Sequence, residues 1–123
     1  MKVIVRITEN FKTEAKPLIK KYRSFSGDLL KLEKELTLNP RLGTSLGQDA
    51  YKIRLKISSK NKGKSGGARV ISLIDSTIIG LTEQVSPNQI YVNLLTVFDK
   101  SDIASITDKE LKDLIKRFKD QSK

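Results

Sequence analysis

The sequence contains no histidine and no cysteine among its 123 residues. Without histidine it lacks the most common general acid–base residue and metal ligand, and every histidine-based catalytic triad is excluded. Without cysteine there is no disulfide framework and no thiolate chemistry, and a zinc site would lack its usual ligands. The acidic residues form neither a DxD pattern nor a glutamate cluster. We therefore expect a protein that works without a metal, and we expect no small-molecule cofactor.

Long apolar runs are also absent. No segment approaches the length needed to cross a bilayer, and the apolar part of the N-terminus, residues 3–7, is too short for a signal peptide. Together with the absence of cysteine, this predicts a cytoplasmic protein with no membrane partner. The length allows one hydrophobic core, so we predict a single domain over residues 1–123.

Acidic residues are missing from one basic stretch. The net charge is +10, from 24 cations and 14 acids. Residues 50–74 contain no Asp or Glu and seven cations, which are Lys52, Arg54, Lys56, Lys60, Lys62, Lys64 and Arg69. The rest of the chain carries the other 17 cations and all 14 acids, so this stretch supplies most of the excess positive charge. Its natural partners are polyanions: nucleic acid first, an acidic protein second, an anionic membrane surface third.

The first half of the chain predicts a strand followed by two helices. Residues 2–7 alternate as a short strand. Thr8 or Asn10 can cap a helix, and Pro17 should kink this helix or mark its true start. Its apolar face would consist of Phe11, Ala15, Leu18, Ile19 and Tyr22. A second helix is expected over residues 28–38, with Leu29, Leu32 and Leu36 as its stripe, and a short break makes the two helices a hairpin. Residues 41–47 then read as a structured loop.

The second half predicts three strands and a final helix. Residues 51–58 alternate strictly between apolar and mostly cationic positions, which indicates a strand with one basic face. A Lys-, Gly- and Ser-rich loop at 59–67 leads to a strand at 68–74, which residues 77–81 extend or follow. Residues 90–98 are apolar on both faces and predict a central strand. Thr107 and Glu110 form a capping box for a helix whose buried stripe is Leu111, Leu114, Ile115 and Phe118. The element order favours an α+β fold with helices packed on an antiparallel sheet.

The cations of the 51–58 strand are the sharpest functional signal. Lys52, Arg54 and Lys56 share one face at a spacing of about 6.5–7 Å. Edge strands often carry lysines merely to prevent aggregation, but such surfaces usually mix charges of both signs. We therefore interpret this row as a basic binding surface. Lys60, Lys62 and Lys64 would add RNA-binding charge from the loop, although a plain flexible loop explains them equally well. The loop matches no nucleotide-binding motif.

Two further cations flank apolar strands. Arg69 opens the strand at 68–74, and Lys100 follows the strand at 90–98. Both should lie near sheet ends, where they would complete a concave cationic site with the 51–58 strand. Taken singly, each is more often an ordinary surface cation.

In this order, the motifs resemble the RelE/ParE superfamily of toxins from type II toxin–antitoxin systems, and most closely its RelE-like branch. The resemblance extends from about Phe11 to the C-terminal helix. It rests on Asn39-Pro40-Arg41-Leu42-Gly43, Tyr51-Lys52-Ile53-Arg54-Leu55, Gly66-Gly67-Ala68-Arg69-Val70-Ile71 and Leu94-Leu95-Thr96-Val97-Phe98-Asp99-Lys100.

The resemblance implies a RelE-like, microbial-RNase-like α+β fold and the activity of an mRNA interferase. Such an enzyme is a metal-independent endoribonuclease that cleaves mRNA in the ribosomal A site by means of the RNA 2′-OH. It also implies two sets of partners, a cognate antitoxin and the ribosome with its mRNA. The catalytic positions carried over are Lys52, Arg54, Arg69 and Lys100, with Lys56 close by for RNA binding. An antitoxin segment would cover the basic strand or displace the C-terminal helix.

One position departs from the family pattern. Phe98 stands where related sequences often have tyrosine, and no tyrosine follows Tyr91. Phe98 would then supply only base stacking. Two alternatives stay open: a non-enzymatic ParE-like inhibitor of DNA gyrase, and a non-toxic relative that binds nucleic acid.

Overall fold

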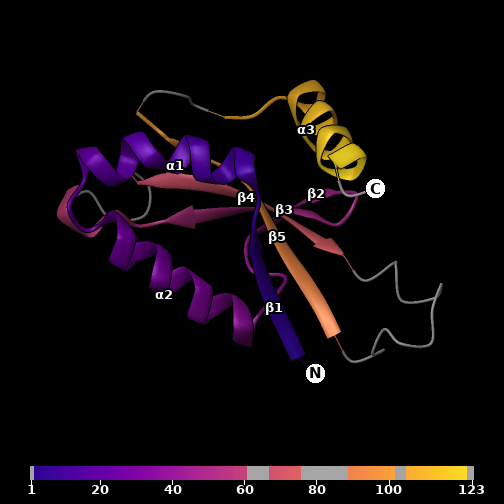
Figure 1. Ribbon diagram of the computed structural model, residues 1–123, viewed down its shortest axis with the longest axis horizontal. Helices are drawn as coiled ribbons and strands as arrows, with labels where there is room; N and C mark the ends of the chain where they lie inside the picture. Colours follow the sequence, from indigo (N-terminus) through magenta and orange to yellow (C-terminus); the bar gives the residue numbers. More distant parts are fainter. Residues whose placement is uncertain (1, 61–66, 76–88, 102–104, 122–123) are drawn as a thin grey trace.

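The protein is described by a computed structural model for residues 2–60, 67–75, 89–101 and 105–121. Within these residues, a five-stranded sheet has the order β1-β5-β4-β3-β2. Its strands are β1 (Lys2–Ile7), β2 (Thr44–Gly47), β3 (Ala50–Leu55), β4 (Ala68–Asp75) and β5 (Gln89–Asp99). Three helices flank it, α1 (Glu9–Lys21), α2 (Phe25–Leu38) and α3 (Asp108–Gln121) (Figure 1). The predicted α+β class is confirmed.

Strand direction differs from the expectation at one edge of the sheet. The pairings of β2 with β3, β3 with β4 and β4 with β5 are antiparallel. The pairing of β1 with β5 is parallel. The sheet is therefore mixed. A short apolar strand such as residues 2–7 carries the same alternation in either direction, so its pattern did not reveal which neighbour it would join.

The N-terminal helical hairpin forms as predicted. The Thr8 hydroxyl accepts the Phe11 N–H at 3.1 Å and caps α1, and Pro17 lies inside that helix instead of marking its start. Ile19 was assigned to the apolar face, but 43% of it is exposed, because Phe11, Ala15 and Leu18 already fill the side that meets the sheet. The second helix starts at Phe25, three residues early, and the Phe25 side chain is completely buried.

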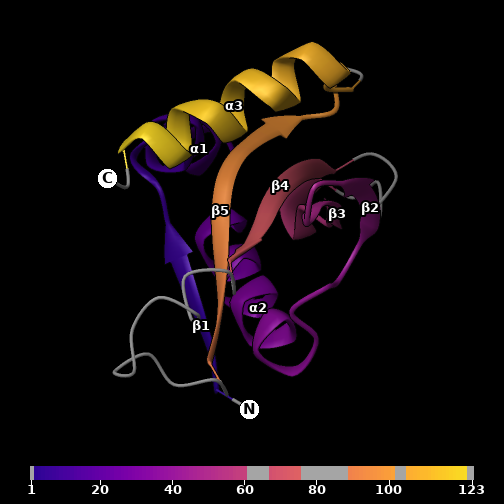
Figure 2. The ribbon, with the colours of Figure 1, turned by 90° about the vertical axis from the view of Figure 1, so that its right-hand side faces the viewer.

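Two cores lie on opposite faces of the sheet. The larger packs α1 and α2 against one face, with Phe11, Phe25, Leu36, Ile53 and Val97 among its members. The smaller packs α3 against the other face; it contains Leu111, Leu114, Ile115, Ile71 and Phe98. Figure 2 shows α3 crossing over the end of β5.

Residues 41–47 depart from the predicted loop, because residues 44–47 form β2. Thr44 pairs with Lys52, and Ser45 pairs with Tyr51. Gly47, Gln48 and Asp49 have positive φ angles of 83°, 56° and 65°, which reverse the chain into β3. The polar sequence of β2 gave no sign of a strand. It forms a strand because it pairs with β3.

The capping box of α3 is confirmed. The Thr107 N–H donates to Glu110 Oε1 at 3.0 Å, and the Glu110 N–H donates to Thr107 Oγ1 at 3.1 Å. Hydrogen bonding of the Glu110 carboxyl to Thr107, to its backbone N–H first and to its side chain second, holds the pKa of that carboxyl below its ordinary value. Leu111, Leu114 and Ile115 are buried as expected, and Phe118 is half-buried. None of the helices in the described part of the chain has the length and apolarity needed to span a membrane.

Candidate nucleic-acid interface

The cation row of β3 has the alternation that the sequence predicted. Ile53 and Leu55 point into the core under α1 and α2. The intervening side chains face the other way: Lys52 is half-buried, and Arg54 is exposed. β3 ends at Leu55, so Lys56 lies just beyond it and is also exposed. Lys52 lies opposite Ile71, which belongs to the core under α3, so the row is on the α3 side of the sheet.

Arg69 joins this row from the neighbouring strand. It lies directly opposite Arg54 in the β3–β4 pairing. Side chains of such a pair share a face and have Cβ atoms about 4.5–5.5 Å apart, and like charges at this spacing are unfavourable. Burial leaves Arg69 only 4% exposed, and burial together with the charge of Arg54 lowers the pKa of its guanidinium. One guanidinium nitrogen, Nη1, donates to the Ala68 carbonyl at 3.1 Å. Arg69 is therefore not the surface cation that a lone arginine would suggest.

Lys100 extends from the end of β5 beside the start of β4. Its backbone N–H donates to the Gly67 carbonyl at 3.1 Å, and its side chain is exposed. Gly67 packs so closely on β3 that a Cβ there would collide with the Leu55 carbonyl oxygen. Three adjacent strands thus bring Arg54, Arg69 and Lys100 to the same end of the sheet. Lys60 ends a 3₁₀ turn, η1 (Ser58–Lys60), while Lys62 and Lys64 lie outside the described residues, as does the segment 77–81.

Phe98 has a different environment from the one a stacking residue needs. It lies opposite Arg69 on β5 but is only 8% exposed, packed in the core under α3. A ring this buried offers little surface to a base. Its main role in this structure is packing.

A hydrogen-bonded carboxylate beneath the cation row was missed by sequence reasoning. Asp28, in the first turn of α2, is 4% exposed and accepts the Ser58 hydroxyl at 2.6 Å and the Ser58 N–H at 3.0 Å. It also accepts the Ser24 hydroxyl at 2.8 Å. Burial alone would raise its pKa, but these hydrogen bonds and the charge of Lys31 together hold the pKa below its ordinary value. The only sequence signal was an acid near a helix start, which says nothing of Ser58.

Two open pockets lie between α2 and the part of β3 that carries the cations. One is lined by Leu42, Thr44 and Lys52, the other by Lys31, Lys56 and Ser58. Glu35 and Arg54 line both pockets, so each combines a carboxylate with cations.

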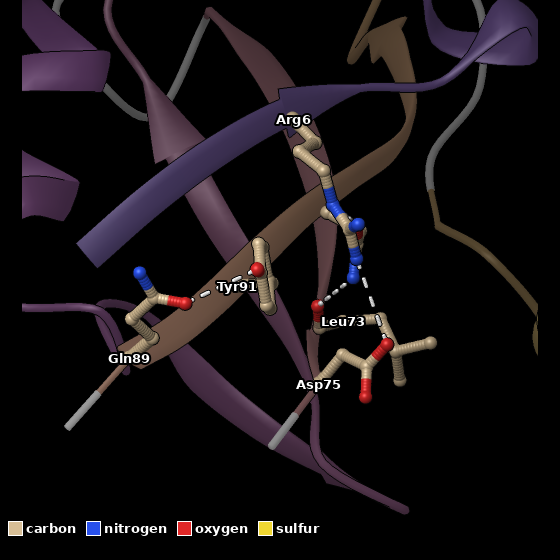
Figure 3. Close-up of polar contacts among 6 residues, drawn as sticks. Arg6, Leu73, Asp75, Gln89 and Tyr91 are labelled. Atoms are coloured by element: carbon tan, nitrogen blue, oxygen red, sulfur yellow. Dashed lines mark hydrogen bonds and ion pairs between the residues drawn. The ribbon is translucent and has the colours of Figure 1, made fainter. Parts of the chain in front are cut away.

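A second polar cluster lies at the β1 edge, far along β5 from the cation row. Arg6 Nε donates to Asn93 Oδ1 at 2.8 Å, and its guanidinium stacks on the Tyr91 ring at 4.1 Å from the centroid. The same guanidinium forms an ion pair with Asp75 at 3.5 Å, so the Arg6 side chain extends from β1 across β5 to β4 (Figure 3). Because a carboxylate already neutralises Arg6, we assign this cluster to holding β1 in the sheet.

The described residues contain no group of three or more His, Cys, Asp or Glu side chains placed to hold a metal ion. The arrangement at the cation row can instead supply fixed positive charge to a phosphate. Arginine and lysine can do this without a metal, because developing negative charge on phosphoryl oxygens is stabilised by pre-positioned cations.

Comparison with known proteins finds a similar structure but no match by sequence. No family model matches the chain, and no curated protein matches it significantly. Among solved structures, it is similar to the Escherichia coli toxin RelE, in the free state of a double arginine-to-alanine mutant. The match covers 95% of this chain and 98% of that one, with a TM-score of 0.54 and 20% sequence identity. The chain therefore has the RelE fold.

Proposed function

We propose that this chain is the toxin of a type II toxin–antitoxin module and that it cleaves ribosome-bound mRNA. The observation that carries the proposal is the buried Arg69 directly opposite Arg54. Like charges in directly opposed positions are unfavourable for stability. The same two guanidinium groups would both attract the negative charge of a phosphodiester. The RelE fold of the chain supports the same conclusion.

In the proposed reaction, the RNA 2′-oxygen attacks the adjacent phosphorus and loses its proton. The bond from phosphorus to the 5′-oxygen breaks, and that oxygen takes up a proton. The products are a 2′,3′-cyclic phosphate and a 5′-hydroxyl. Lys52, Arg54 and Lys100 meet the phosphate and stabilise its added charge, and the buried Arg69 adds positive charge from beneath them. Lys56 holds the neighbouring backbone, and the ribosome holds the nucleotide in line for attack.

The proposal is tested by adding the purified protein to a translating extract and mapping mRNA breaks by primer extension. We expect ribosome-dependent breaks from the wild type, reduced about a hundredfold or more in Lys52→Ala/Arg54→Ala. Lys16→Ala is the matched control: Lys16 is exposed on α1, which covers the opposite face of the sheet. Intact mRNA with the wild type would overturn the nuclease assignment. Growth arrest without cleavage would then point to gyrase inhibition, and no arrest to a non-toxic relative.

The proposed partner is an antitoxin whose acidic segment covers the cation row. Charge complementarity supports this, since Lys52, Arg54 and Lys56 have no acid among their immediate neighbours in sequence. In the complex, Lys52 should become protected from an amine-acetylating reagent while Lys16 stays reactive. A complex that leaves Lys52 and Arg54 fully exposed would contradict this arrangement.

A further inference from the structure

A buried carboxylate lies immediately before Lys100. Asp99 ends β5 and is only 2% exposed. It lies opposite Ala68 of the core under α1 and α2, so its side chain points away from the cation row and toward the helices. Burying a carboxylate is unfavourable unless hydrogen bonds compensate, so its presence calls for a role that an apolar residue would not fill.

The two oxygens of Asp99 hold different parts of the chain. Oδ2 accepts the Tyr22 hydroxyl at 2.6 Å, and Tyr22 is the C-terminal cap residue of α1. Oδ1 accepts the Ser101 N–H at 2.8 Å. The carboxylate therefore ties the turn that follows β5 to the end of a packed helix.

Lys100 lies between these fixed points. Asp99, the residue before it, accepts a hydrogen bond from the Tyr22 hydroxyl. Ser101, the residue after it, donates its N–H to Asp99. Its own N–H donates to the Gly67 carbonyl at 3.1 Å. The Lys100 side chain is exposed, but the backbone around it is fixed by these three hydrogen bonds.

We infer that Tyr22 and Asp99 are positioning residues that set the turn carrying Lys100 at the phosphate site. The inference rests on the proposed function for the role of Lys100. The pair acts through backbone geometry: the Tyr22 hydroxyl orients the carboxylate, the carboxylate fixes the Ser101 N–H, and the turn between them aims Lys100. A small displacement of a charged group from its productive position is enough to slow a reaction severely.

The first test needs no activity. Tyr22→Phe removes one hydroxyl and keeps the ring, and amide hydrogen exchange is followed by NMR. We expect faster exchange at Lys100 and Ser101, with Val92 and Val97 in the core unchanged. Tyr91→Phe is the matched control, because its hydroxyl donates to Gln89 at 3.3 Å near the other end of β5. Unchanged exchange at Lys100 and Ser101 in Tyr22→Phe would overturn the inference, whatever the protein cleaves.

The second test uses the cleavage assay and a double-mutant cycle. Tyr22→Phe should lower kcat about tenfold with little change in KM, whereas Tyr91→Phe should cleave as the wild type does. In a Lys100→Ala background, Tyr22→Phe should have no further effect, because the group it positions is gone. Equal losses in both backgrounds would show a general structural role and refute the inference. A wild type that does not cleave would refute the proposed function, leaving hydrogen exchange to decide the positioning.

Discussion

At the scale of single residues, the proposed site contains two arginines whose like charges oppose each other. Arg54 and Arg69 are opposed across two strands, and Arg69 is desolvated as well. Local conflicts of this kind are expected where residues serve a function as well as the fold. This predicts that stability and activity respond in opposite directions at Arg54.

Arg54→Gln should therefore raise the free energy of unfolding by about 0.5 kcal/mol while it lowers cleavage and RNA binding. The gain comes from removing the repulsion on Arg69. Urea denaturation measures it, with Arg54→Lys as the control that keeps the like charge. A destabilised Arg54→Gln protein would show that Arg54 makes a net structural contribution.

Asp28 is expected to make stability depend on acid pH. Its folded-state pKa is depressed, so its contribution is complete above the ordinary carboxyl pKa of about 3.9 and is lost as pH falls through the lower folded value. At pH 7, Asp28→Asn should be less stable by roughly 1–3 kcal/mol, since it weakens the hydrogen bonds from Ser58 and Ser24. The difference from the wild type should narrow below about pH 4. Urea denaturation across pH 2.5–7 measures this, and a constant difference would rule the linkage out.

At the scale of elements, the hairpin of β2 and β3 sets where Lys52 lies. Gly43 precedes β2 with a φ of 105°, and a Cβ there would collide with the Lys52 carbonyl oxygen. Only glycine fits such a conformation and such an approach without strain. The close contact holds the entry to β2 against the backbone of the cationic strand.

Gly43→Ala should lower the free energy of unfolding by about 2 kcal/mol or more, because the strand entry must move. Gly27→Ala is the matched control: Gly27 lies in α2, and nothing stands within 4 Å of an added Cβ. It should stabilise the protein by roughly 0.5–1 kcal/mol through helix propensity. Thermal and urea denaturation distinguish the two, and a neutral Gly43→Ala would refute the close-packing argument.

At the scale of the whole molecule, the two faces of the sheet carry different residues. The face under α1 and α2 holds the larger core, and the face under α3 carries Lys52, Arg54 and Arg69 beside the smaller core. Arg54, Lys56, Arg69 and Lys100 all lie where three adjacent strands begin or end. A polyanion bound there should displace counterions in proportion to the cations that it meets.

RNA affinity should consequently fall steeply with salt. For single-stranded RNA, Lys52→Ala should reduce the slope of log K against log salt by about 0.7, and Lys16→Ala should leave it unchanged. Fluorescence anisotropy with a short labelled RNA at several salt concentrations measures both slopes. Equal slopes for the two variants would mean that binding does not use this face.

Local patterns in the sequence were enough to predict most of the elements and the basic face of one strand. The alternation around Lys52 and Arg54 produces a strand with one basic face in almost any sheet, and the Thr107–Glu110 capping box starts a helix regardless of its neighbours. The absence of histidine and cysteine likewise limits the chemistry before any folding is considered. These features depend on residues close together along the chain.

Only the tertiary structure decided the features that depend on distant partners. The parallel pairing of β1 with β5, the burial of Arg69 and Phe98, and the hydrogen bond from Tyr22 to Asp99 each join segments separated by many residues. A carboxylate or an arginine looks the same in the sequence whether it ends up in water or under a helix. Its burial is set by which elements pack over it, and that is a property of the assembled sheet and helices.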